Sequence, residues 1–170
     1  MAEVLEKLKE PENMQEYEED TQKDKYLTFV IGKEVYGIEI KFVTEIIGIQ
    51  PITQVPELPN YVKGIINLRG KIVPVIDVRL RFKKEPRDYN DRTCIVVIDI
   101  KEISVGLIVD SVAEVVDISE EDIVPPPNTN TGFNNRYIKG IGKMDEQVKL
   151  IIDCNEFLDD KQCDNLIDIG

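Results

Sequence analysis

The sequence reads YGIEIKFVTEII at residues 36–47 and VGLIVDSVAEVV at residues 105–116. Three residue types recur at matched positions: Gly37 and Gly106, Val43 and Val112, and Glu45 and Glu114. Two stretches that match in this way within one chain indicate a duplicated folding unit. We therefore interpret the chain as two copies of one unit.

The match continues beyond these stretches. YVKGI at residues 61–65 lies over YIKGI at residues 137–141, and Ile76-Asp77 lies over Ile152-Asp153. A duplicated unit indicates what the fold requires, because both copies must keep it. A residue that only one copy carries needs a second explanation.

Short apolar runs with a period of two predict the β-strands. They include residues 26–31, 35–40, 62–67, 71–76, 94–100, 105–109 and 113–118. A short helical turn is allowed within residues 40–49, and Asp77 and Asp153 are placed to cap helical turns after the last strand of each copy. About five strands in each half of about 65 residues favour an all-β fold of two small barrels with short helices. A single sandwich with a pseudo-twofold axis is the alternative.

The expected organisation has three parts. Residues 1–25 form an acidic, disordered head, residues 26–158 form the folded unit, and residues 159–170 form an acidic tail. The first barrel covers approximately residues 26–88 and the second approximately residues 92–158, with exchange of strands between the halves left open. The proline-rich stretch from Pro125 to Arg136 is expected to be a loop. Because barrels this small are marginal alone, we expect the halves to pack together, with a groove between them as the place for binding.

Charge and composition exclude several function classes. The net charge is −12, of which −5 lies in residues 1–25 and −3 in residues 159–170. A negative net charge is repelled by phosphate groups, so nucleic acid and anionic membrane surfaces are disfavoured as partners. Histidine is absent, so histidine-dependent nucleophile pairs and imidazole metal sites are excluded, and we expect neither cofactor nor metal. No catalytic constellation stands out, so the chain is interpreted as a binding protein and not as an enzyme. An enzyme that uses carboxylates alone and a small-barrel nucleic-acid binder are the competing classes.

The two copies differ most clearly at one predicted hairpin. Arg69 and Gly70 in the first copy are replaced by Asp145 and Glu146 in the second. The fold therefore does not require an arginine at this position. Arg69 is interpreted either as a solvated turn residue or as a guanidinium that binds a carboxylate or carbonyl groups of a partner.

Other candidates recur in both copies. Glu45 recurs as Glu114, which favours a structural role slightly over a contact with a partner. Gly64, Gly106 and Gly140 follow or interrupt apolar runs, and the simpler interpretation is a backbone bend where a side chain would collide.

These residues closely resemble the CheW family of bacterial chemotaxis coupling proteins. The resemblance covers roughly residues 26–158 and is carried by residues 36–46, Pro59 to Gly64, the hairpin from Asn67-Leu68-Arg69-Gly70 to Asp77, and residues 105–110. It implies two five-stranded barrels that resemble SH3 domains, without catalytic activity. It also implies a cytoplasmic adaptor that couples the hairpin tip of chemoreceptors to the regulatory domain of the histidine kinase CheA, in arrays at the inner membrane.

The resemblance further implies a receptor-facing role for a set of seven residues: Val43, Glu45, Gly64, Arg69, Gly70, Gly106 and Val112. It assigns no kinase-facing residues. It implies mechanical coupling, in which a groove binds the receptor tip, another face binds the kinase, and many modest contacts combine into avidity.

Overall fold

The computed structural model describes residues 22–126 and 137–158. The predictions for the head, the proline-rich loop and the tail fall mainly on residues 1–21, 127–136 and 159–170, which lie outside these ranges. Within the two described ranges, no helix is long and apolar enough to cross a bilayer.

Strands predominate among the described residues, and their pairing gives two sheets, which confirms the all-β prediction. One sheet has, in spatial order, β3 (Val43–Gly48), β6 (Cys94–Ile100), β7 (Ile103–Val109), β5 (Lys71–Asp77) and β4 (Val62–Leu68). The other has β8 (Ser111–Asp117), β1 (Lys25–Ile31), β2 (Glu34–Glu39), β11 (Gln147–Ile152), β10 (Ile138–Met144) and β9 (Ile123–Val124).

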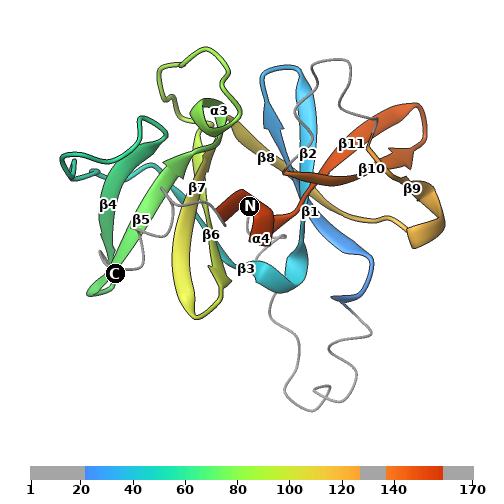
Figure 1. Ribbon diagram of the computed structural model, residues 1–170, viewed down its shortest axis with the longest axis horizontal. Helices are drawn as coiled ribbons and strands as arrows, with labels where there is room; N and C mark the ends of the chain where they lie inside the picture. The colour runs from blue at the N-terminus through green and yellow to red at the C-terminus, as the bar shows by residue number, and fades with distance from the viewer. Residues whose placement is uncertain (1–21, 127–136, 159–170) are drawn as a thin grey trace.

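The two sheets fit two SH3-like barrels that lie side by side (Figure 1). We call them the β4–β5 barrel and the β10–β11 barrel, after the hairpin that each one contains. The β10–β11 barrel has one strand more than the five expected, because the two-residue strand β9 pairs with β10. This strand is preceded by the short η3 turn (Glu120–Asp122).

The two barrels exchange a hairpin. The β1–β2 hairpin of the first half pairs with β8 and β11, and the β6–β7 hairpin of the second half pairs with β3 and β5 (Figure 1). The sheets therefore do not follow the ranges 26–88 and 92–158. A local cause is visible between β7 and β8, where Asp110 is the single connecting residue. Because a tight antiparallel turn needs about two residues, the chain runs on into the other sheet. The η2 turn (Ile40–Phe42) occupies the equivalent place between β2 and β3.

One hydrophobic core joins the barrels. Phe29 of β1 and Leu107 of β7 belong to different sheets and to the same cluster of buried residues. The ring of Phe82 lies 5.0 Å from that of Tyr36 and 5.7 Å from that of Phe157, measured between centroids. Since these contacts connect both halves, we expect the barrels to unfold as one unit.

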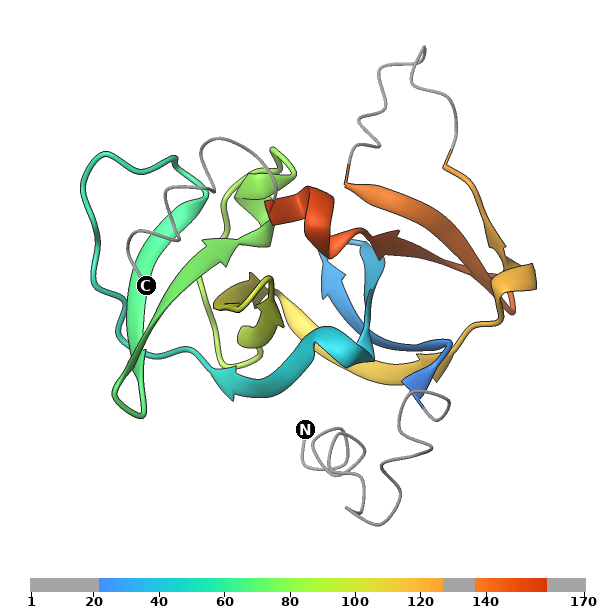
Figure 2. The same cartoon turned by 60° about the horizontal axis from the view of Figure 1, so that its bottom comes forward.

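Two short helices lie next to each other between the barrels (Figure 2). Helix α3 (Val78–Arg81) follows β5, and α4 (Cys154–Leu158) follows β11. The amide of Leu80 donates to Asp77 Oδ1 at 3.4 Å, and the amide of Glu156 donates to Asp153 Oδ1 at 3.1 Å. Both predicted caps are confirmed. Arg81 joins the helices, because its Nη2 donates to the carbonyl oxygen of Phe157 at 2.9 Å.

Candidate functional site

The turn between β4 and β5 adopts an unusual backbone for its sequence. Arg69 has a φ of 52° and Gly70 a φ of 84°, which is the pattern of a type I′ hairpin turn. Asparagine, aspartate or glycine is the usual first residue of such a turn, since other residues are strained there. The amide of Gly70 donates to Asn67 Oδ1 at 2.8 Å and fixes the turn. An arginine at this position is therefore explained poorly by turn formation alone.

The side chain of Arg69 reaches across to strand β3. Its Nη1 donates to Glu45 Oε1 at 3.2 Å, and its Nη2 also donates to Glu45 Oε2, so the pair is bidentate. The hydrogen bonds and the charge of Glu45 raise the pKa of Arg69 above its ordinary value. The Arg69 side chain is nonetheless 72% exposed, whereas that of Glu45 is 21% exposed. Exposed ion pairs contribute little to stability, so the geometry orients a guanidinium toward solvent more than it stabilises the fold.

This arrangement suits binding rather than catalysis. A guanidinium has five N–H donors in a planar fork, and Glu45 engages only part of them. The remaining donors can bind a carboxylate or the backbone carbonyl groups of a partner. Glu45 limits the rotamers of Arg69 in advance and reduces the entropy that binding would cost.

The seven predicted residues do not all lie together. Glu45, Arg69 and Gly70 meet at one end of the β4–β5 barrel, which is the lower end in Figure 1. Val43 begins β3 and is buried opposite Ile98. The other three residues lie within strands, namely Gly64 in β4, Gly106 in β7 and Val112 in β8.

Gly64 and Gly106 have steric requirements within the protein. Gly64 has a φ of 144°, and a methyl group on it would collide with the carbonyl group of Thr53. A methyl group on Gly106 would lie 2.7 Å from Ile95 Cγ2. Both observations agree with the sequence-based interpretation that a side chain would collide at these positions. Val112 lies in β8 and pairs with Phe29, so it belongs to the β10–β11 barrel.

The second copy lacks the arginine and keeps the turn. Asp145 has a φ of 56° at the position equivalent to Arg69. Glu114, the counterpart of Glu45, cannot form the same pair with an aspartate. Its backbone carbonyl accepts a hydrogen bond from Thr28 Oγ1 at 2.7 Å, at a bulge in β8 where Ala113 and Glu114 lie opposite Thr28. The ion pair is thus specific to the β4–β5 barrel.

A separate cavity lies beside α3 and is lined by residues of the first half and by Tyr137 of the second half. It has a volume of about 650 Å³. Its walls are formed by Asn60, Tyr61, Leu80, Arg81, Lys83, Lys84, Glu85, Pro86 and Tyr137. None of the seven predicted residues is among them, so the candidate site and this cavity are different places.

Sequence reasoning missed the contact of Asn67 with the turn. The residue type gave a signal, because asparagine side chains commonly accept hydrogen bonds from backbone amides in turns. The contact between Glu45 and Arg69 was also not predicted, although both residues were selected. Their pairing depends on how the two edges of one barrel approach each other, which local sequence does not determine.

Comparisons with known proteins agree on one family. A family model described as the CheW-like domain matches residues 25–162. The Chemotaxis protein CheW of Helicobacter pylori is 33% identical over 158 residues, which cover 93% of this chain and 95% of that protein. The Chemotaxis protein CheW of Klebsiella aerogenes is 33% identical over 143 residues, covering 84% and 86%. The crystal structure of the scaffolding protein TtCheW from Thermoanaerobacter tengcongensis matches with a TM-score of 0.76 and 37% identity over 82% of this chain and 94% of that chain.

Proposed function

The chain belongs to the CheW-like domain family, and from this premise we propose that it is a non-catalytic adaptor that couples chemoreceptors to the histidine kinase CheA. Residues 26–158 are the functional unit in this proposal, with an acidic head before it and an acidic tail after it. The adaptor acts in the cytoplasm, in receptor arrays at the inner membrane.

The single observation that carries the proposal is the exposed ion pair of Arg69 and Glu45 on a turn that the second copy replaces. Arg69 occupies strained backbone, its ion pair contributes little to stability, and the duplicated barrel folds without it. These properties are expected of a residue kept for contact with a partner. The partner proposed for this end of the barrel is the helical-hairpin tip of a chemoreceptor.

The proposed receptor surface is centred on Glu45, Arg69 and Gly70. Val43 supports it from beneath, because it is buried two residues before Glu45. Gly64, Gly106 and Val112 complete the proposed set. The two glycines contribute by allowing close packing of the strands beneath the surface, since their steric requirements lie inside the barrel.

The proposed mechanism is mechanical coupling. One end of the β4–β5 barrel binds the receptor, and another face of the protein binds the regulatory domain of CheA. Because that domain resembles this fold, related barrel pairs can alternate in rings or extended arrays. Contacts of modest affinity then gain strength from the number that are linked.

The test is reconstitution from purified components. Receptor-containing membranes and CheA are combined with and without this chain, and kinase autophosphorylation is measured over a concentration series. We expect kinase activity and its response to receptor ligand to depend on the chain in a saturable way. Activity and ligand response that are the same with and without the chain would contradict the proposed function.

A further inference from the structure

A polar chain of three side chains joins the receptor-facing turn to the neighbouring hairpin. Lys71 follows Gly70 directly, and its Nζ donates to Ser104 Oγ at 2.7 Å. The Ser104 hydroxyl in turn donates to Asp99 Oδ1 at 2.5 Å. Asp99 of β6 and Ser104 of β7 are direct partners in the strand pairing. The start of β5 is therefore tied to the β6–β7 hairpin through a largely buried serine.

The second barrel shows that the fold does not need this network of three polar side chains. Strand pairing defines the equivalent positions, because Val30 pairs with Val35 in β1–β2 as Asp99 pairs with Ser104 in β6–β7. The second barrel therefore replaces Lys71, Ser104 and Asp99 with Gln147, Val35 and Val30. Two valines in contact form an ordinary cross-strand pair in a sheet. The polar chain thus differs between the copies as a set, together with Arg69 and Gly70.

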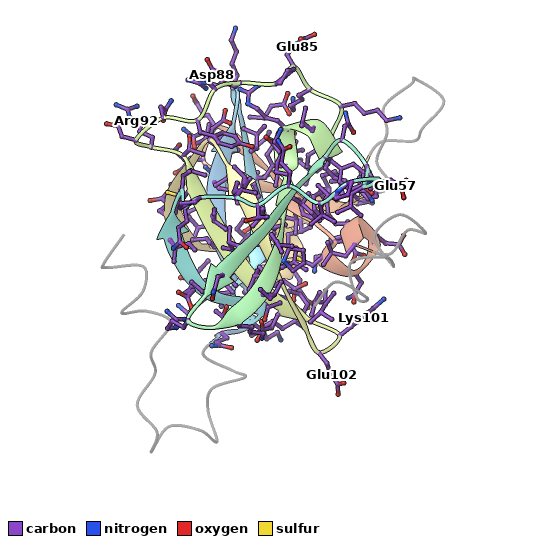
Figure 3. All side chains as sticks on the ribbon, turned by 90° about the vertical axis from the view of Figure 1, so that its left-hand side faces the viewer. Glu57, Glu85, Asp88, Arg92, Lys101 and Glu102 are labelled. Atoms are coloured by element: carbon purple, nitrogen blue, oxygen red, sulfur yellow. The ribbon has the colours of Figure 1, made fainter. Side chains whose placement is uncertain are left out.

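The residues of this set, which differ between the two copies, lie at one end of the β4–β5 barrel, so their joint replacement points to a role for that end. The β4–β5 turn and the β6–β7 turn lie at the same end of one barrel (Figure 1). Lys101 and Glu102 of the β6–β7 turn project there, at the end opposite Glu85, Asp88 and Arg92 (Figure 3). The Arg69–Gly70 turn is thereby held from two sides, by Glu45 of β3 and by the Ser104–Asp99 pair through Lys71.

We propose that Lys71 is a positioning residue, which acts with Ser104 and Asp99 to fix the Arg69–Gly70 turn in the pose that binds the receptor. This inference rests on the proposed function and adds a residue to it. A binding group needs neighbours that limit its movement, because a loosely held group loses affinity through ordering entropy. Glu45 limits the guanidinium itself, whereas Lys71 limits the backbone that carries it.

The test measures binding of a soluble chemoreceptor fragment that contains the hairpin tip. Lys71→Met removes the ammonium group and keeps the length of the side chain. We expect the receptor Kd to rise roughly threefold to tenfold, the range that loss of one hydrogen bond gives. Lys71→Arg restores a donor to Ser104, so its Kd stays near the wild-type value. Lys143→Met, the same chemical change at an exposed position of strand β10 in the other barrel, serves as the matched control and leaves the Kd unchanged.

Two further measurements separate the possible outcomes. CheA affinity and thermal stability are measured for every variant, and Arg69→Asp is included as a reference. If Lys71→Met binds receptor like the wild type while Arg69→Asp does not, the positioning role is overturned and the proposed function stands. If Lys71→Met lowers receptor affinity, CheA affinity and stability together, its role is structural and the inference is also overturned. If Arg69→Asp binds receptor normally, the proposed receptor contact itself fails.

Discussion

The guanidinium of Arg79 binds the carboxylate of Asp110 through two hydrogen bonds, from Nε to Oδ1 and from Nη2 to Oδ2, each 2.8 Å long. Asp110 is the single residue between β7 and β8, where the chain passes from one barrel to the other. Its Oδ2 also accepts hydrogen bonds from the Gly32 amide at 2.8 Å and from Arg87 Nη1 at 3.2 Å. The crossing point is thus fixed to α3, to the β1–β2 turn and to the segment after α3.

The first prediction concerns stability. Asp110→Asn keeps the shape of the side chain and removes the charge that faces Arg79. Because the two side chains are only 14% and 13% exposed, the loss leaves a poorly solvated guanidinium without its counter-ion. We expect a loss of about 3 kcal/mol in the free energy of unfolding, measured by urea denaturation. Asp117→Asn is the matched control, since the Asp117 carboxylate is 72% exposed and its pair with Lys25 contributes less than about 1 kcal/mol.

A second prediction concerns pH. Burial alone would raise the pKa of Asp110, but hydrogen bonds from Arg79 and Gly32 and the charges of Arg79 and Arg87 outweigh it and hold that pKa below its ordinary value. In the unfolded chain the carboxyl group titrates near its ordinary pKa of about 3.9. Its stabilising contribution is therefore fully present above that pH and is lost as the pH falls toward the folded-state pKa.

The measurement is the free energy of unfolding between about pH 5 and pH 2 for the wild type and for Asp110→Asn. We expect the stability difference between the two proteins to shrink as the pH falls. A difference that stays constant over this interval would show that the Asp110 charge does not carry the effect.

A third prediction tests the role of Gly64. Gly64→Ala places a methyl group against the Thr53 backbone in a conformation with positive φ, so either the β4 strand or the Thr53–Ile65 bridge must move. We expect a loss of about 3 kcal/mol in the free energy of unfolding, with weaker receptor binding as a consequence. Gly48→Ala is the control, because its methyl group meets no atom within 4 Å. Normal stability in Gly64→Ala, with receptor binding lost, would instead identify Gly64 as a direct contact.

The strands were predictable because their evidence is local. The run predicted at residues 94–100 coincides with β6, and the run predicted at residues 71–76 lies within β5. The caps at Asp77 and Asp153 were predictable for the same reason, since each cap binds an amide three residues further on.

The hairpin exchange was less accessible to sequence reasoning. Alternation of apolar residues gives each strand a buried face but does not say which sheet the strand joins. Two duplicated halves have the same pattern whether or not they exchange hairpins. The single residue Asp110 between β7 and β8 is visible only in the structure, because the strands predicted at residues 105–109 and 113–118 leave three residues between them.

The candidate site was predictable in part. Comparison of the two copies selected Arg69 and Gly70, because substitution at matched positions is visible in the sequence. The link from Lys71 to Ser104 was not visible, since it joins residues 33 positions apart and depends on the parallel pairing of β5 with β7. Contacts of this kind require the strand register of the whole barrel.

The most direct measurement of the central claim is the affinity of a chemoreceptor fragment for Arg69→Asp, which introduces the residue of the second copy. Arg92→Asp makes the same chemical change at the opposite end of the same barrel and is the control (Figure 3). We expect Arg69→Asp to weaken receptor binding roughly tenfold or more, as is usual for a central arginine contact, while its thermal stability and CheA affinity stay near the wild-type values. Receptor binding that is unchanged, or that weakens only in parallel with stability or equally in Arg92→Asp, would contradict the claim.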